Sequence, residues 1–341
     1  MTHRILVVFT GGTIGSRLNA SSIGIVDGAA FALLDGYMKR SNSGSDVEFK
    51  VIEPLSILSE NAHPKHWTRI ATAIKEADPT AFDGIVVTHG TDTLSHTSAA
   101  LGLALHDLAV PLVLVSSNHP LDDPHANGYQ NFVDAVTFIT SVGMPGAFAV
   151  YANPDGRRLV HRATRLDDAT ALNHFFFSVG RSEVGEFDGD GFRAYEIDEA
   201  FGTVLPPLAP RFDPDVLLIT PYPGMSYASI DLTAVHAVVH DLYHSGTACV
   251  DSTQGPSTSL VGFARQCVDR GIPLFIAPIP DADAEYDSAA EFHDAAILPV
   301  PGMRAATARA KVMLGLANGL AGSELCDFVT THSLAYEFLP R

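Results

Sequence analysis

The strongest constraint on this chain is a repeated alternation, within its first third, of short β-branched runs with helix-like segments. Such alternation is typical of a parallel sheet whose strands are joined by crossover helices. The runs at residues 84–88 and 111–116 are apolar and end at small polar residues, as buried strands do. We therefore predict an α/β fold. The expected strands are residues 5–10, 47–52, 84–88 and 111–116, and the expected helices are residues 64–77 and 95–108.

Two further signals divide the rest of the chain. An Asn-Pro-Asp-Gly turn at residues 153–156 predicts a hairpin between strands at 147–151 and 158–161. From Glu183 to Arg211 the composition shifts to Gly, Asp and Pro, which indicates a linker. A second alternating series then begins. Its expected strands are residues 215–220, 247–251 and 272–277, and its expected helices are residues 232–245, 257–270 and 303–318.

These patterns predict two α/β domains. The larger N-terminal domain, residues 1–185, should hold a mainly parallel sheet with a hairpin. Residues 186–213 are the expected linker, and residues 214–341 should form a smaller C-terminal domain with a parallel sheet. A chain of 341 residues is long enough for each domain to bury its own core without disulfides or a structural metal.

The composition limits the compartments in which the protein is expected to work and the partners that it is expected to bind. The net charge of −18 disfavours nucleic acid and anionic membranes as partners. No stretch approaches the roughly 20 apolar residues that span a bilayer, and the first apolar run leads into a glycine turn rather than a cleavage site. The three cysteines cannot all pair and lack a metal-binding spacing. We expect a soluble, cytoplasmic protein that binds neither nucleic acid nor membrane.

Two polar loops follow expected strands, where the ligand crevice of a parallel sheet lies. In the first, Thr10 to Gly15, paired glycines allow a ligand to come close to the backbone. The segment has neither the P-loop nor the dinucleotide-binding pattern, and a plain tight turn is the alternative. In the second, Thr88 to Thr93, Thr91 stands beside Asp92. A hydroxyl next to a carboxylate can orient a polar substrate or a water, although Asp92 could instead cap the following helix.

These two loops resemble the two signatures of the bacterial-type L-asparaginases, also called asparaginase/glutaminases, and most closely the cytosolic type I branch. The resemblance extends along nearly the whole chain. The further segments that carry it are Leu58-Ser59-Glu60-Asn61, Ser116-Ser117-Asn118-His119-Pro120, Asn127-Gly128-Tyr129-Gln130-Asn131 and Thr220-Pro221-Tyr222-Pro223-Gly224-Met225-Ser226.

The resemblance implies a role for each matching residue. Thr13 is the implied nucleophile and Thr91 the second catalytic threonine. Asp92 and Ser59 would bind the α-amino and α-carboxylate groups of the substrate, because a carboxylate pairs with an ammonium and a hydroxyl donates to a carboxylate. Backbone amides near the two threonines would stabilise the oxyanion. The other implied substrate-binding residues are Gly12, Gly90, Glu60 and Ser117. Neither a metal nor an organic cofactor is needed.

The sequence departs from the family at four positions. Residues 17–25 lack the family's flap tyrosine, and Arg165 stands at the position expected for its lysine, with His161 a second candidate. Arginine stays protonated and cannot accept a proton, but it could hold Asp92 or polarise a carbonyl; a surface ion pair with Asp167 or Asp168 is the alternative. Gly255-Pro256 replaces a family Gly-Asn pair, and Asn127 replaces an aspartate. His89 or His119 could supply a base with a pKa near neutrality.

We therefore expect an amidohydrolase that converts L-asparagine to L-aspartate and ammonia through a threonine nucleophile and an acyl-enzyme. Three alternatives stay open at this point: an enzyme of the same mechanism that acts on another small amide, a catalytically impaired amino-acid-binding protein, and a nucleotide-binding domain. The resemblance also implies a homodimer or homotetramer.

Overall fold

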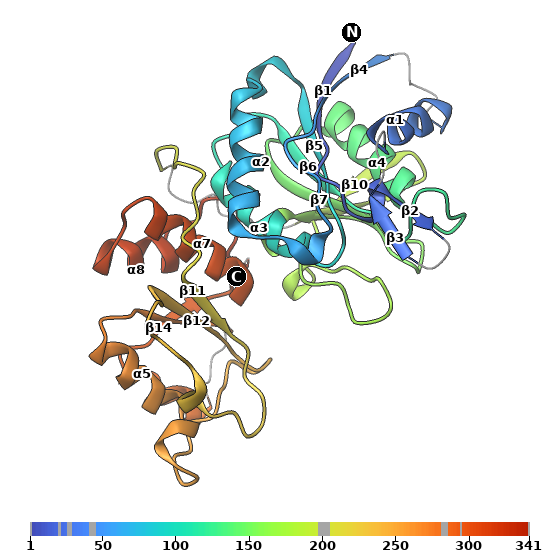
Figure 1. Ribbon diagram of the computed structural model, residues 1–341. Coiled ribbons are helices and arrows are strands. Elements are labelled where there is room, and N and C mark those ends of the chain that lie inside the picture. The colour runs from blue at the N-terminus through green and yellow to red at the C-terminus, as the bar shows by residue number, and fades with distance from the viewer. Residues whose placement is uncertain are drawn as a thin grey trace. The chain divides into compact units, whose positions relative to one another are not determined.

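The computed structural model describes residues 2–19, 22–25, 29–40, 46–196, 205–280, 286–293 and 295–339. Its chain divides into two compact units (Figure 1). The first comprises residues 1–199 and 205–210, and the second comprises residues 200–204 and 211–341. Part of the predicted linker, residues 197–204, lies outside the described residues. Each unit contains its own sheet with helices, which confirms the predicted α/β fold.

The first unit is built on a sheet with the strand order β10-β9-β8-β7-β6-β5-β1-β4. The strands from β4 to β7 are parallel, and β8, β9 and β10 continue the sheet in antiparallel pairing. β5 and β6 are buried along their whole length, as their continuous apolar sequences predict. The strands are β1 (His3–Val8), β4 (Val47–Ile52), β5 (Gly84–Thr88), β6 (Pro111–Val115), β7 (Gly146–Ala152), β8 (Arg158–Arg162), β9 (Gly185–Asp188) and β10 (Gly191–Ala194).

Helices cover both faces of this sheet (Figure 1). One core cluster joins α1 (Ala29–Arg40) and α4 (Gly128–Thr137) to the sheet, and the other joins α2 (Pro64–Glu76) and α3 (Leu94–Ala104). α2 shows why periodicity predicts such elements, because its buried residues Trp67, Ile70, Ala71 and Ile74 recur at helical spacing. A small antiparallel hairpin, β2 (Ser16–Asn19) and β3 (Ser22–Ile25), follows the first glycine loop. A one-turn π-helix (Phe138–Val142) extends α4.

The expected linker begins inside the first sheet. Residues 186–194 form most of β9 and all of β10, joined by a tight turn at residues 189–190. These strands are only four residues long, so their sequence shows little period-2 alternation, and the Gly and Asp content of their turn resembles a linker. The hairpin of β7 and β8 at the Asn-Pro-Asp-Gly turn is present as predicted.

The second unit holds a parallel sheet with the order β11-β12-β13-β14. α5 packs into its core cluster, whereas α7 contacts β11, β12 and α8. The elements are β11 (Val216–Ile219), β12 (Ala237–Asp241), α5 (Leu260–Asp269), β13 (Leu274–Ile279), α6 (Asp287–Ala290), β14 (Leu298–Pro301), α7 (Ala305–Ala317) and α8 (Gly322–Thr330). Among the described helices, none is both long enough and apolar enough to cross a membrane.

Two expectations for this unit are wrong. The predicted helix at 232–245 is replaced by β12, and residues 247–251 form no strand. Val238 and Val239 belong to a short buried run, and such a run cannot be assigned to helix or strand by periodicity alone. Residues 237–241 form a strand rather than a helix because they pair in parallel with both β11 and β13.

A buried ion pair fixes the end of the chain to α7. Lys311 and Glu337 are fully buried, with 2.8 Å between Lys311 Nζ and Glu337 Oε1. The ammonium also donates to the Val329 and His332 carbonyls, and the carboxylate accepts from the backbone N–H of Leu334. Burial alone would raise the pKa of Glu337, but the Lys311 charge and these hydrogen bonds hold it below its usual value.

We predict that Glu337→Gln lowers the free energy of unfolding by about 3–5 kcal/mol, because it leaves the Lys311 ammonium buried without an opposite charge. The double variant Lys311→Met/Glu337→Gln should recover part of this loss. Urea unfolding at neutral pH measures both. Lys39→Met, which breaks the exposed pair with Asp35, is the control and should cost less than about 1 kcal/mol. A single variant as stable as the wild type would contradict the prediction.

Candidate functional site

The candidate site lies at the carboxyl ends of β1 and β5, two neighbouring parallel strands. Hydrogen bonds join the residues at the ends of these two strands directly. The Thr10 hydroxyl donates to the Thr88 carbonyl at 2.5 Å, and the Thr10 N–H donates to Thr88 Oγ1 at 3.2 Å. A third segment joins them, since Gly12 N–H donates to the Ile57 carbonyl and Ile57 N–H donates to the Thr10 carbonyl. The loops that carry Thr13, Ser59 and Thr91 therefore start from one edge of the sheet.

Gly12 and Gly90 pack backbone against backbone. Gly12 has a φ of +78°, which favours glycine, and a Cβ placed on it would lie 2.3 Å from the Gly90 nitrogen. A Cβ on Gly90 would lie 2.5 Å from the Ser59 hydroxyl oxygen. Because any side chain would separate them, the two glycines allow the first and second signature loops and the Ser59 turn to touch.

Ser59 and Asp92 are joined by two hydrogen bonds. The Ser59 hydroxyl donates to Asp92 Oδ2 at 3.1 Å, and the Asp92 N–H approaches the same hydroxyl oxygen at 3.3 Å. Thr93, the residue that caps α3, donates from its hydroxyl to the Ser59 carbonyl. Asp92 is therefore not the capping residue, and its exposed carboxylate is held beside Ser59.

Thr13 and Thr91 are both half-buried. Thr13 opens a 3-10 turn directly after Gly12, and Thr91 follows Gly90. Within the ranges that the structure describes, neither hydroxyl forms a hydrogen bond with another residue. Two threonine hydroxyls thus lie on adjoining loops, beside a carboxylate held by a serine.

The other predicted site residues are less closely connected to this group. Glu60 is exposed on the 3-10 turn that Ser59 begins. Ser117 is buried and donates to the His119 carbonyl, a hydrogen bond within its own loop. Arg165 is only 3% exposed, so its interpretation as a surface arginine is wrong. The substrate-binding roles of Glu60 and Ser117 and the catalytic role of Arg165 stay predictions.

The segment of Arg165 nevertheless lies against the start of α3. The Ser95 hydroxyl donates to Asp168 Oδ1, and His96 Nε2 lies 3.6 Å from the same oxygen. Ser95 and His96 belong to the first turn of α3, which begins two residues after Asp92. This arrangement brings the backbone on which Arg165 sits into the neighbourhood of the second signature loop.

His89 is not the neutral-pH base that the sequence suggested. It is fully buried, and burial lowers its pKa to about 4, although the Gly90 carbonyl and the Asp92 charge oppose this shift. Both ring nitrogens are already engaged, Nδ1 with the Gly90 carbonyl at 2.8 Å and Nε2 with the Thr97 hydroxyl at 3.0 Å. His161, the second candidate for the family's lysine position, is also fully buried, and burial lowers its pKa to about 3.

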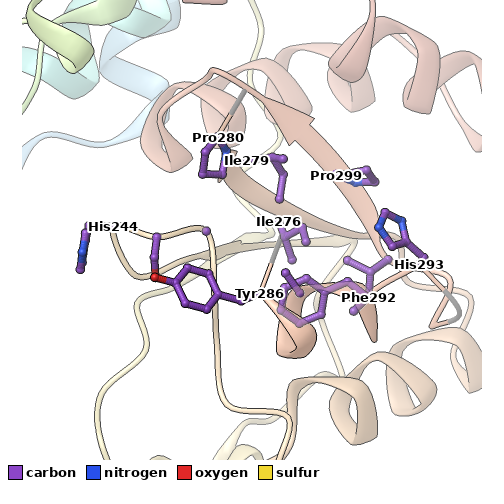
Figure 2. A pocket seen from close by; sticks show the side chains of 12 residues that line it. His244, Ile276, Ile279, Pro280, Tyr286, Phe292, His293 and Pro299 are labelled. Atoms are coloured by element: carbon purple, nitrogen blue, oxygen red, sulfur yellow. The ribbon is translucent and has the colours of Figure 1, made fainter. Parts of the chain in front are cut away.

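A separate pocket of about 280 Å³ lies in the second unit (Figure 2). It contains none of the predicted site residues. Its wall is mostly apolar, from side chains such as Ile276 and Phe292, with Tyr286 and His244 also lining it. Among the described residues that line it, Ser245 offers a hydroxyl and His244 and His293 offer imidazole rings, but none offers a carboxylate.

One cluster in the described part of the chain has the residue types of a metal site. Asp213, Asp215 and His236 bring ligand atoms within 4.8 Å of one another. His236 Nδ1 already pairs with Asp213 Oδ2 at 2.7 Å, and this hydrogen bond raises the pKa of His236. The cluster precedes β11 and β12, at the edge opposite to the one where parallel sheets bind ligands.

The family profile described as Asparaginase, N-terminal matches residues 4–197. The chain belongs to the asparaginase family. It is 31% identical over 243 residues to a subunit of the glutamyl-tRNA(Gln) amidotransferase of Thermoplasma acidophilum. That match covers 70% of this chain and 58% of the relative, so the chain spans less than two thirds of that relative's length. The corresponding protein of Saccharolobus solfataricus is 25% identical over 354 residues, covering 99% of this chain and 76% of its own length.

Solved structures share the fold. The thermostable L-asparaginase from Thermococcus kodakarensis has a TM-score of 0.81 at 23% identity, covering 99% of this chain and 100% of its own. L-asparaginase I from Vibrio cholerae has a TM-score of 0.78 at 23% identity, with 99% of each chain covered. The family match over residues 4–197 confirms the resemblance, and the family places this chain among enzymes that act on amide C–N bonds.

We predict that Gly12→Ala reduces kcat/KM for amide hydrolysis at least a hundredfold, because the added Cβ would displace the loops that carry the predicted oxyanion donors. The added Cβ must push the Gly90 backbone away. Gly156→Ala is the matched control, because Gly156 also has a positive φ but its Cβ would meet nothing within 4 Å. Steady-state kinetics on both variants separate the contact from backbone strain. Equal losses in the two would contradict this account.

Proposed function

We propose that this chain is an amidohydrolase that converts L-asparagine to L-aspartate and ammonia in the cytoplasm. The observation that carries the proposal is the contact of two threonine loops beside the Ser59–Asp92 pair. Asp92 offers a carboxylate to an α-ammonium group, and the Ser59 hydroxyl would turn from Asp92 to donate to an α-carboxylate. An α-amino acid held by both would present its side-chain amide to the threonines.

Thr13 is the proposed nucleophile. Its oxygen forms a bond to the amide carbon as its proton passes to a base, and the oxyanion that results is stabilised by backbone N–H groups. Collapse of this intermediate breaks the C–N bond, and the nitrogen takes up a proton and leaves as ammonia. Water then attacks the acyl-enzyme ester, which releases L-aspartate and restores the Thr13 hydroxyl. Thr91 is proposed as the second catalytic threonine.

Arg165 is proposed to act electrostatically. It stays protonated in proteins and so cannot be the proton acceptor of this reaction. A buried guanidinium can fix a carboxylate or polarise a carbonyl, and its backbone lies near the loop that holds Asp92. Glu60, Gly12, Gly90 and Ser117 are proposed to complete the substrate site.

A second candidate is hydrolysis of another small amide, glutamine first among them. It is favoured by the 31% identity to part of a glutamyl-tRNA(Gln) amidotransferase, and by Gly255-Pro256 in place of the family's Gly-Asn pair. We further propose a homodimer or homotetramer, on the resemblance to the family alone. An ammonia-release assay with asparagine, glutamine and a panel of small amides separates the two candidates. Binding without turnover would instead indicate an amino-acid-binding protein.

We predict that Thr13→Ala lowers the rate of asparagine hydrolysis at least a hundredfold, because the nucleophile and its activation are lost together. Thr13→Ser keeps a hydroxyl and should retain more activity than Thr13→Ala. Single-turnover ammonia release measures both variants. Near-normal activity in Thr13→Ala would exclude Thr13 as the nucleophile.

We predict that Arg165→Lys keeps part of the activity and that Arg165→Met keeps less, because only the first retains a positive charge near Asp92. The ratio of kcat/KM between the two variants measures the contribution of this charge. If both variants match the wild type, Arg165 does not face the substrate site.

A further inference from the structure

Three buried side chains form a continuous hydrogen-bonded chain below the second signature loop. Trp67 of α2 donates from Nε1 to the hydroxyl of Thr97 on α3, at 3.0 Å. The same hydroxyl lies 3.0 Å from Nε2 of His89, the residue that follows β5. His89 Nδ1 then lies 2.8 Å from the carbonyl oxygen of Gly90. We call these three residues, Trp67, Thr97 and His89, the relay.

The two ends of the relay determine the direction of two of its three hydrogen bonds, and the protonation state of the His89 ring determines the third. An indole N–H can only donate, and a carbonyl oxygen can only accept. His89 must therefore donate from Nδ1 to Gly90, and Thr97 accepts from Trp67. In a neutral ring Nε2 then carries no proton, so the Thr97 hydroxyl donates to it. This assignment requires the neutral Nδ1–H tautomer of His89. It agrees with the lowering of the His89 pKa to about 4 by burial.

The relay determines the orientation of one peptide group. His89 N–H remains paired with the Val115 carbonyl of β6 at 2.9 Å, so the backbone is anchored to the sheet at this residue. The next carbonyl, that of Gly90, is held toward the buried imidazole. In a trans peptide the N–H points opposite to the C=O, so the Thr91 N–H points away from His89. Throughout the described ranges, no residue accepts a hydrogen bond from that N–H.

We propose that the relay orients the Gly90–Thr91 peptide so that the Thr91 N–H stabilises the oxyanion, which makes His89, Thr97 and Trp67 positioning residues. This inference rests on the proposed amidohydrolase function. The neutral imidazole exchanges no proton with the substrate. It holds a carbonyl in place, and through the rigid peptide it holds the donor on the opposite side.

The decisive variants remove one hydrogen bond at nearly constant volume. Thr97→Val deletes the hydroxyl, whereas Thr97→Ser keeps it. Loss of one oxyanion donor costs about 10²–10³ in kcat, so a donor that is merely misoriented should cost about tenfold or more. We expect this loss of kcat in Thr97→Val with little change in KM, and near-normal kcat in Thr97→Ser. Thr137→Val is the control, because the Thr137 hydroxyl bonds only to a carbonyl within α4.

A second pair of variants separates the two ring nitrogens of His89. The side-chain amide nitrogen of Asn occupies the place of Nδ1 and can still donate to Gly90. The amide of Gln occupies the place of Nε2 and can bond only to Thr97. The proposal expects His89→Asn to keep more of kcat than His89→Gln. The reverse order, or wild-type kcat in Thr97→Val, would overturn it.

The tautomer can be tested without any turnover. In a protein labelled with ¹⁵N-histidine, ¹H–¹⁵N correlation spectra distinguish protonated from unprotonated ring nitrogens, and His89→Asn assigns the His89 signals. We expect Nδ1–H, unchanged between neutral pH and about pH 5 because the pKa is about 4. An Nε2–H tautomer or a cationic ring would refute the relay. If the wild-type protein shows the expected tautomer but releases no ammonia from asparagine, glutamine or the other small amides, the proposed function is refuted instead.

Discussion

The contact between the backbones at Gly12 and Gly90 is the constraint on which the rest of the site depends. This contact joins the loop after β1 to the loop after β5. The Ser59 side chain, on a third loop, packs against Gly90. With the hydrogen bonds between Thr10 and Thr88, it leaves these loops little freedom to move independently. A reaction that needs a nucleophile, an oxyanion donor and a substrate carboxylate site together depends on such fixed spacing, since small displacements reduce rates strongly.

The fold of the first unit could be predicted where short β-branched runs are bounded by polar residues. β4 and β5 both have the boundaries expected from the sequence, although only β5 is buried along its whole length, whereas β4 is partly exposed. Prediction failed where pairing partners decide. β12 is a strand through its parallel neighbours, and β9 and β10 are too short to show a period, so their assignment depends on contacts distant in sequence.

For the site, the sequence located the loops but not the state of each side chain. Thr13 and Thr91 could be singled out because their loops follow expected strands and resemble the two family signatures. The burial of Arg165 and His89 could not be predicted, since a charged or titratable residue is usually exposed and only the tertiary structure says otherwise. The relay has a weak signal in the sequence: Trp67 lies on the buried stripe of α2, and an indole N–H that is buried there needs an acceptor. Thr97 as that acceptor emerges only from the packing of α2 on α3.

The second unit contains an informative parallel to the relay. His240 in β12 also bonds the following carbonyl through Nδ1, and its Nε2 lies 2.8 Å from the Tyr227 hydroxyl. Burial likewise lowers its pKa, to about 4. A buried neutral histidine that holds the next carbonyl is therefore a local solution that this chain uses in both units. The two histidines differ in the peptide that they orient. The peptide after His89 joins a glycine to a threonine and packs against a second glycine loop, whereas His240 orients the peptide between Asp241 and Leu242. The histidine supplies orientation, and the surrounding loops determine whether that orientation has a chemical use.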